Sequence, residues 1–203
     1  PKEGGQRVAF HSVVCREPEP FELALAGVHQ AENAALVIMA AKLLEREDVR
    51  VTEKAIRTAL RTVRHPARFE ILANEGVPVV IDGAHNPAGM RALRTGLDTY
   101  FPDLPRVFLL GILKDKDIDT MLAALLRPGD QVVTVRPNSE RAAAADVVAA
   151  VAAGMGLVTV ACDDRAKGLD EAVRRAHVRS ALLVVAGSLY LVGDIRRLLM
   201  AGR

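Results

Sequence analysis

From Val77 onward, short apolar runs alternate with longer segments of mixed polarity. Runs rich in valine, leucine and isoleucine are typical of strands buried on both faces. Their regular alternation with helix-length segments predicts an α/β fold with a doubly wound, mostly parallel sheet. The predicted strands are 77–81, 106–111, 131–135, 157–161 and 181–186. The predicted helices are 87–100, 118–126, 142–153, 165–176 and 189–200.

The chain before this region has a different pattern. Segments 6–15 and 21–26 alternate loosely between apolar and polar residues, which predicts antiparallel strands with one face in water. An alanine-rich helix is predicted over 31–44, and its apolar residues cover most of its circumference. Thr52 is a good N-cap for a second helix that runs to about Val63.

Pro66 interrupts this second helix, and an extended piece, 65–74, follows it. We therefore predict a boundary near Arg64–Ala67, with one domain over 1–64 and another over 65–203. The chain also opens at Pro1, without a methionine, directly into strand-like sequence. We expect it to be part of a longer protein.

The sequence between Val77 and Pro87 carries the strongest candidate chemistry. A buried strand ends abruptly in Asp82 and Gly83, and Asn86 with Pro87 is a favourable start for a helix. Asp82 and His85 should therefore lie at the carboxyl end of a strand, beside the free N–H groups of a helix N-terminus. Ligands bind at that edge of open α/β sheets, and phosphates favour it.

Other polar groups follow the remaining predicted strands, so that one sheet edge should collect a binding site. These groups are Lys114–Asp117, then Arg136, Asn138, Ser139 and Arg141, then Asp163 and Asp164, and finally Ser188.

A simpler interpretation exists for each of them. Asp82 and His85 can serve only to satisfy hydrogen bonds of the turn. Lys114–Asp117 reads equally as a solvated loop with a helix N-cap, and Ser188 either caps a helix or contacts an anion.

Composition narrows the class of protein. Half of the residues are apolar and the formal charge is only +2, without a basic stripe and with few aromatic residues. We therefore expect no nucleic-acid partner. No signal peptide or membrane span is recognisable, and Cys15 and Cys162 follow no metal or redox spacing. A cytoplasmic protein with reduced thiols, which has no contact with a membrane, is the simplest expectation.

Several nucleotide-binding and catalytic motifs are absent from the sequence. No G-x-x-x-x-G-K-[ST] phosphate loop occurs, no G-x-G-x-x-G follows the first strand, and no G-x-S-x-G is found. The sequence shows no pair of His or Cys residues at metal-ligand spacing, so we expect no metal site within the chain.

Five short motifs resemble those of folylpolyglutamate synthase/dihydrofolate synthase, a branch of the ATP-dependent Mur ligase superfamily. Their order and spacing hold over nearly the whole chain, and the last one favours the folate enzymes over the cell-wall ligases. The motifs are Gly27-x-His29-Gln30-x-x-Asn33-Ala34-Ala35, His65-Pro66-x-Arg68-Phe69-Glu70, Asp82-Gly83-Ala84-His85-Asn86-Pro87, Gly111-x-x-x-Asp115-Lys116-Asp117 and Gly187-Ser188-Leu189-Tyr190-Leu191-Val192-Gly193.

The resemblance implies a Rossmann-like C-terminal glutamate ligase domain, preceded by the end of the central ATPase domain. In such enzymes ATP phosphorylates a carboxylate of dihydropteroate or of a folate, and the amine of L-glutamate then displaces phosphate. The phosphate loop, the Mg²⁺ ligands and most of the pterin site would lie in an N-terminal ATPase domain outside this chain, on which the chain would pack. The chain alone should then be inactive.

The resemblance also implies roles for single residues. Asn33 would contact adenine, Arg68 the ATP phosphates and Asp82 the ribose, with the candidate catalytic residue His85 close by, while Ser188 would help to hold the incoming glutamate. The chain departs from the family at Ala67, where glycine often stands beside the arginine, and the backbone near Arg68 could shift as a result.

Two other functions are compatible with the residues. One is a free-standing α/β nucleotide-binding or interaction module without ligase activity, and the other is a muramyl-type ligase. Under the ligase hypothesis, we expect Asp82→Ala to impair the use of ATP and to leave the fold intact, because a turn residue lies outside the core. The choice between dihydropteroate and folates is left open, because the residues that contact the pterin would lie upstream.

Overall fold

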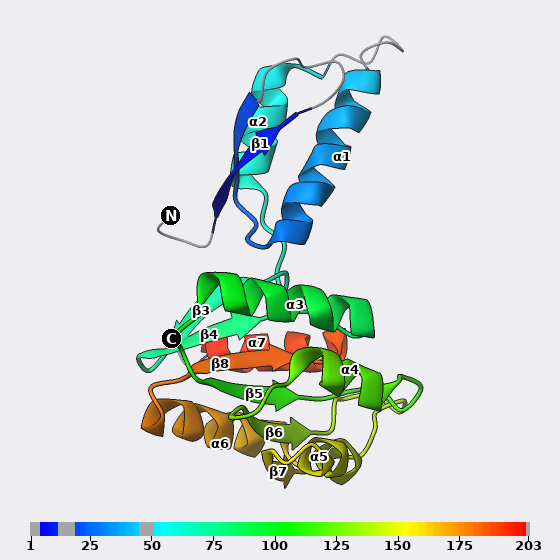
Figure 1. Ribbon diagram of the computed structural model, residues 1–203, viewed down its shortest axis with the longest axis vertical. Helices are drawn as coiled ribbons and strands as arrows, with labels where there is room; N and C mark the ends of the chain where they lie inside the picture. Colours follow the sequence, from blue (N-terminus) through cyan, green and yellow to red (C-terminus); the bar gives the residue numbers. More distant parts are fainter. Residues whose placement is uncertain (1–4, 12–18, 45–50, 202–203) are drawn as a thin grey trace. The chain divides into compact units, whose positions relative to one another are not determined.

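The computed structural model describes residues 5–11, 19–44 and 51–201. The chain divides into two compact units, Pro1–Pro66 and Ala67–Arg203 (Figure 1). Cys15 and the predicted strand residues 12–15 lie outside the described residues. No helix of the described residues is both long and apolar enough to span a bilayer.

The first unit is a hairpin of two strands packed with two helices. Strand β1 (Gln6–Phe10) pairs antiparallel with β2 (Glu19–Leu23), as the alternating pattern predicts, but β2 begins two residues before the predicted segment 21–26 and ends three residues before its end. Helix α1 (Val28–Leu44) follows, and α2 (Glu53–Thr62) begins at the predicted cap, where the Thr52 hydroxyl accepts the Ala55 N–H at 3.2 Å. One apolar cluster joins these elements and includes Phe10, Phe21, Leu23, Ile38, Ile56 and Leu60.

The second unit is built on a six-stranded sheet with the order β3-β4-β8-β5-β6-β7. The predicted parallel strands are confirmed, with small shifts at their ends, as β4 (Val77–Ile81), β5 (Arg106–Leu110), β6 (Gln131–Val135), β7 (Val158–Cys162) and β8 (Leu182–Ala186).

One strand of this sheet was not resolved by the sequence pattern. Part of the predicted extended piece forms β3 (Glu70–Asn74), which pairs antiparallel with β4 at the sheet edge. The two strands are joined through Glu75 and Gly76, both at positive φ (48° and 82°). Such angles at two central residues are characteristic of tight hairpin turns. The start of β3 therefore lies beside the end of β4, with Glu70 opposite Ile81.

Five helices cover the two faces of the sheet. Alternate residues of a strand point to opposite faces, and Val79, Ile81, Leu183 and Val185 share one apolar cluster with residues of two helices, α6 (Arg165–Val178) and α7 (Leu189–Ala201). Helix α3 (Pro87–Tyr100) packs on α4 (Ile118–Leu125), which packs on α5 (Ala145–Gly154) over the other face (Figure 1).

Helix α5 begins three residues later than the sequence predicts, at Ala145 instead of Ala142. Ala142 forms an isolated antiparallel bridge with Leu113, and the Ala143 N–H donates to the Ile112 carbonyl at 2.9 Å. These hydrogen bonds between the loops after β5 and β6 replace the first helical turn.

The strand order places a topological switch beside β8. Strand β8 lies between β4 and β5, and the helix that follows it, α7, covers the face opposite to α3 and α4. Open α/β sheets form a crevice at the carboxyl ends of strands where successive helices leave to opposite faces. The ends of β4, β5 and β8 are therefore the expected place for a ligand.

Candidate functional site

Asp82 follows β4 directly, and its carboxylate is buried, with 7 % of the residue exposed. Its Oδ2 accepts the Phe69 N–H and its Oδ1 accepts the Ala84 N–H, both at 2.8 Å. Each carboxylate oxygen can accept more than one hydrogen bond, so binding to backbone does not exhaust Asp82 as an acceptor. Asp82 lies directly after β4 as predicted, but the prediction that it lies outside the core is wrong, because the residue is buried and its carboxylate holds the backbone of two segments.

Arg68 lies in a short loop, Ala67–Phe69, which we call the Arg68 loop. The loop precedes β3, and the Gly83 N–H donates to the Ala67 carbonyl at 2.7 Å, so Arg68 lies at the same sheet edge as Asp82. The side chain of Arg68 is exposed and makes no hydrogen bond or ion pair within the described part of the chain. A guanidinium without a partner is suited to bind phosphate oxygens.

The backbone of the Arg68 loop is strained. Ala67 and Phe69 have φ angles of 63° and 47°, in the left-handed region that glycine prefers. Each such residue costs about 1–2 kcal/mol. Glycine at position 67 would adopt this φ angle without the strain.

His85 is exposed, and its ring is oriented by the loop that precedes α3. The Nδ1 atom lies 2.8 Å from the carbonyl oxygen of Gly83, and a carbonyl can only accept, so we assign the proton to Nδ1. In the neutral ring, Nε2 is then the atom with a lone pair. Next to it, the Asn86 side chain accepts the Gly89 N–H at 2.7 Å and caps α3, as predicted.

Ser188 follows β8 and is buried, with 1 % of the residue exposed. Its Oγ accepts the Leu191 N–H at 3.2 Å, which is the geometry of a helix cap. The preceding Gly187 has φ 114°, and a Cβ there would lie 2.8 Å from the Gly111 carbonyl oxygen. The close approach of the chain after β5 and β8 therefore requires glycine at position 187.

Asn33 belongs to the first unit, near the start of α1, and its side chain is exposed. Its Nδ2 donates to Gln30 Oε1 at 3.4 Å, and Gln30 Nε2 lies 3.0 Å from His29 Nε2. The three polar residues of the first motif thus form a connected chain of side chains on α1.

The loop after β5 carries Asp115 and Asp117, and both have local partners. Asp115 accepts Arg141 Nη2 at 2.7 Å, which lowers the pKa of Asp115. Asp117 caps α4 by accepting the Thr120 N–H at 3.0 Å. The interpretation of this run as a solvated loop with a helix N-cap agrees with the structure.

Four of the five predicted site residues, Arg68, Asp82, His85 and Ser188, therefore lie in one unit at the carboxyl edge of its parallel strands. Hydrogen bonds join the segments that carry them: Asp82 to Phe69, Gly83 to Ala67, and the Gly187 N–H to the Ala84 carbonyl at 3.0 Å. The prediction that these segments share one edge is confirmed for this unit, whereas the roles of the side chains stay predictions.

Two residues of this neighbourhood, Glu70 and Arg196, were not among the site residues predicted from the sequence. Glu70 Oε2 accepts the Ala67 N–H at 3.0 Å, and Arg196 of α7 donates to both oxygens of Glu70. Glu70 stands in the second motif, which was the available signal. Arg196 lies in no recognised motif.

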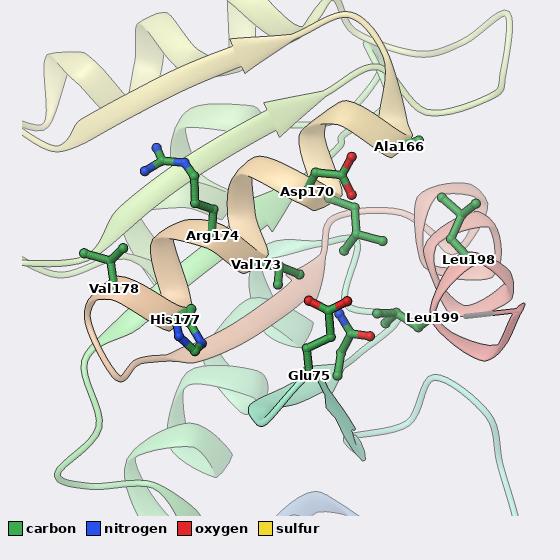
Figure 2. A pocket seen from close by; sticks show the side chains of 11 residues that line it. Glu75, Ala166, Asp170, Val173, Arg174, His177, Val178, Leu198 and Leu199 are labelled. Atoms are coloured by element: carbon green, nitrogen blue, oxygen red, sulfur yellow. The ribbon is translucent and has the colours of Figure 1, made fainter. Parts of the chain in front are cut away.

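Two hollows of this unit differ in their relation to the predicted site. One, of 760 Å³, lies between α6, α7 and the β3–β4 turn, and it contains none of the predicted residues (Figure 2). Another, of 450 Å³, lies at the carboxyl ends of β6 and β7, where Arg136, Asn138, Ser139 and Asp163 line it. In the first hollow, Arg174 is already paired with Glu171. We therefore place the candidate site by its side-chain chemistry and not by the volume of a hollow.

No group of three or more His, Cys, Asp or Glu side chains is arranged to hold a metal ion within residues 5–11, 19–44 and 51–201. The polar groups at the sheet edge therefore do not form a metal centre by themselves.

Comparison with known proteins decides the family. The family described as Mur ligase, glutamate ligase domain, matches residues 67–189. The chain belongs to the Mur ligase family. The matched region falls in the unit that carries Arg68, Asp82, His85 and Ser188, so the edge described above is an edge of a Mur ligase glutamate ligase domain.

Relatives of this Mur ligase chain have folate-related names. It is 39 % identical over 181 residues to a probable bifunctional folylpolyglutamate synthase/dihydropteroate synthase of Halobacterium salinarum, covering 86 % of this chain and 21 % of the relative. It is 31 % identical over 201 residues to the folylpolyglutamate synthase of Lacticaseibacillus casei, covering 98 % of this chain and 45 % of the relative.

A solved structure shows the same fold. Crystal structures of Mycobacterium tuberculosis folylpolyglutamate synthase complexed with ADP and AMPPCP match 100 % of this chain and 49 % of that chain, with a TM-score of 0.80 and 27 % identity. This Mur ligase chain therefore spans less than half the length of these proteins, and about a fifth of the archaeal relative.

Proposed function

We propose that this chain is the C-terminal part of an ATP-dependent ligase that adds L-glutamate to dihydropteroate, to a folate, or to both. Residues 1–64 would be the end of the central ATPase domain, and residues 65–203 the glutamate ligase domain. The observation that carries the proposal is the exposed guanidinium of Arg68, which has no hydrogen-bond or ion-pair partner among the described residues. It extends from a loop whose backbone Asp82 holds at the switch-point edge of a Mur ligase domain.

The proposed reaction forms an amide in two steps. The terminal phosphoryl group of ATP is first transferred to a carboxylate oxygen of the pterin substrate, which gives an acyl phosphate and ADP. The amine nitrogen of L-glutamate then forms a bond to the acyl carbon, the bond to the phosphate oxygen breaks, and the nitrogen loses a proton. Phosphate leaves.

Each predicted residue has a role that its surroundings allow. Arg68 would bind phosphate oxygens through its planar guanidinium, and the carboxylate of Asp82 would accept hydrogen bonds from the ribose hydroxyls. His85 would lie close to the nucleotide, with Nε2 as a hydrogen-bond acceptor. Asn33 would contact adenine, and Ser188 would donate its hydroxyl hydrogen to the incoming glutamate.

ATP-dependent phosphoryl transfer generally uses Mg²⁺. The described residues do not offer a set of ligands for it, so we derive no step at a metal ion from this chain. We propose that the Mg²⁺ ligands, the phosphate loop and most of the pterin site belong to an N-terminal ATPase domain outside this chain. We also propose a cytoplasmic location, because no signal peptide or membrane span is recognisable in the sequence.

An apolar helix face supports the proposed contact with such a domain. Leu36, Val37 and Leu43 of α1 are 70 %, 55 % and 51 % exposed in a unit whose core already contains Ile38 and Ala41. Contiguous exposed apolar side chains mark interaction surfaces. We propose that this face packs on the remainder of the ATPase domain.

The proposal is tested by assaying glutamate addition with this 203-residue chain and with the complete protein that contains it. The complete protein should consume ATP and extend dihydropteroate or a folate, and the isolated chain should do neither. Activity of the isolated chain would contradict the proposal. So would a complete protein that accepts only UDP-linked cell-wall precursors, which would make it a muramyl-type ligase.

The site itself is tested with Arg68→Ala in the complete protein. Loss of a charge-assisted phosphate contact should raise the KM for ATP about tenfold or more. Arg91→Ala is the matched control, because Arg91 is also exposed in the same unit but lies on α3. An equal and small effect of both variants would remove Arg68 from the site.

A further inference from the structure

The Arg68 loop combines a side chain that has no partner in the described part of the chain with a tightly held backbone. Arg68 stands between two residues at positive φ, Ala67 and Phe69. Such conformations persist only where the surrounding structure determines them. The contacts that hold Ala67 and Phe69 therefore fix the direction in which the Arg68 side chain leaves the loop.

The Phe69 side of the loop is anchored by Asp82 and by packing. The Phe69 N–H donates to Asp82, and the ring is buried beside Tyr100, with 5.5 Å between the ring centroids. A Cβ added at Gly96 would lie 2.6 Å from this ring, so α3 approaches it closely. This anchor belongs to the site already described.

The Ala67 side is anchored by a different residue. Glu70 Oε2 accepts the Ala67 N–H at 3.0 Å, so the carboxylate of Glu70 closes the loop around Arg68. Arg196 in turn holds Glu70 in a two-pronged contact, with Nε to Oε2 and Nη2 to Oε1 both at 2.9 Å. The planar geometry of such a pair fixes the orientation of the carboxylate, which a single contact would not do.

Arg196 also connects the loop to the predicted glutamate site. It lies on α7, and the first turn of that helix is capped by Ser188. A helix is a stiff element, so the pair ties the Arg68 loop to the same helix that Ser188 caps.

We propose that Glu70 and Arg196 are positioning residues that hold Arg68 in its phosphate-binding orientation. The inference rests on the proposed function of Arg68 and adds two residues to it, neither of which touches a substrate. Their effect on catalysis passes through the backbone of Ala67.

The chain offers a matched control for this pair. Glu171 and Arg174 form a similar two-pronged contact, with both distances at 2.8 Å, but both lie on α6 and neither holds a loop. Glu171 also pairs with Arg175 of the same helix, so variants of Glu171 report the loss of ion pairs without the loss of a positioning contact.

The first measurement is made on this 203-residue chain, and it requires no activity. In Glu70→Ala, amide hydrogen exchange at Ala67 and Phe69 should become at least several-fold faster, whereas Glu171→Ala should leave both rates unchanged. Unchanged exchange in Glu70→Ala would show that Glu70 does not hold the loop and would overturn the inference. If Glu70→Ala does not fold, Arg196→Lys, which keeps the charge and loses the planar fork, takes its place.

The second measurement uses the complete ligase and steady-state kinetics. Glu70→Ala should raise the KM for ATP about tenfold, because a small displacement of a binding group has effects of this size or larger. In the Arg68→Ala background the same substitution should have no further effect on this KM, because Glu70 acts through Arg68. Additive effects of the two substitutions would overturn the inference.

A charge swap separates positioning from stability. Glu70→Arg combined with Arg196→Glu can restore an ion pair, but arginine at position 70 cannot accept the Ala67 N–H. The swap should therefore recover the melting temperature lost in Glu70→Ala and leave the KM for ATP raised. Recovery of both quantities would overturn the positioning role. If Arg68→Ala itself does not change the KM for ATP, the proposed function of Arg68 has failed, while the exchange measurement still decides whether the pair holds the loop.

Discussion

Asp82 accepts the backbone N–H of Phe69 across thirteen positions of sequence, at 2.8 Å. The same carboxylate accepts the N–H of Ala84, so one side chain holds the loop before β3 and the turn after β4 together. A residue that the sequence marks as a ligand candidate is thus also a structural acceptor. Both roles place the carboxylate at the edge where the parallel strands end.

Asp82→Ala is expected to lower stability as well as impair the use of ATP. The substitution leaves two backbone N–H groups without their acceptor, at a cost of about 1–3 kcal/mol for each group that stays buried. Urea unfolding measures this loss, and Asp103→Ala is the control because Asp103 is exposed and has no partner within the described residues. Equal stability of both variants, together with unchanged ATP kinetics, would contradict both roles.

Ala67→Gly is expected to stabilise the second unit slightly. Glycine removes a left-handed strain of about 1–2 kcal/mol. It also adds freedom to the unfolded chain, which costs about 0.5–1 kcal/mol. The net gain should therefore be below about 1.5 kcal/mol, and thermal unfolding can measure it. As a control, Ala73→Gly in β3 should destabilise, because it brings the cost of glycine without relief of strain. A loss of stability in Ala67→Gly as large as in Ala73→Gly would contradict the strain at Ala67.

An ion pair at the amino ends of the parallel strands, away from the candidate site, should affect the stability of the protein and not its use of ATP. Arg94 Nη1 lies 3.1 Å from Asp130 Oδ2, and the two side chains are 11 % and 6 % exposed. Burial raises the pKa of Asp130, although the hydrogen bond from the Arg127 N–H and the charge of Arg94 oppose this shift. Asp130→Ala leaves Arg94 with its other partner, Asp98, so we expect a loss of about 2–3 kcal/mol, slightly below that of a buried pair with no second partner. The KM for ATP of the complete ligase should not change, and an increase comparable to that of Arg68→Ala would contradict the placement of the site.

Glu171 should make stability depend on pH in the acid range. Hydrogen bonds from Arg174 and Arg175 lower the pKa of Glu171 from 4.5 to about 2. Because the folded pKa lies below the unfolded one, this contribution is present above pH 4.5 and is lost as the pH falls toward 2. The ion pairs of Glu171 are partly exposed, so their contribution to the free energy of unfolding should stay within about 1 kcal/mol.

The measurement compares the melting temperatures of the wild type and Glu171→Gln at pH 7 and at pH 3. Their difference should be larger at pH 7. A difference that does not change with pH would show that the ion pairs of Glu171 contribute nothing to folding.

Local sequence signals predicted most of the second unit. Strands 77–81 and 131–135 and helix 87–100 have the predicted bounds, because apolar runs, Asn86 and Pro87 act over a few residues. The start of α5 differs because its first turn pairs with another loop. Such pairing between segments has no local signature.

Less of the candidate site than of the fold could be predicted from the sequence. The motifs identified Arg68, Asp82, His85 and Ser188, and the order of strands and helices brought them to one edge. Glu70 and Arg196 are 126 positions apart, and no local pattern indicates that they meet. The positive φ of Ala67 and the burial of Asp82 likewise follow from packing, which a single sequence does not reveal.

The turn at Glu75 and Gly76 sets the alignment of β3 with β4. Side chains alternate along a strand, so a change of one residue in this turn would slide every pair and reverse which face each side chain occupies. The contact between Asp82 and Phe69 would then be lost, although the turn lies at the far end of strands about 17 Å long. The length of this distant turn therefore determines the position of the loop at which phosphate is proposed to bind.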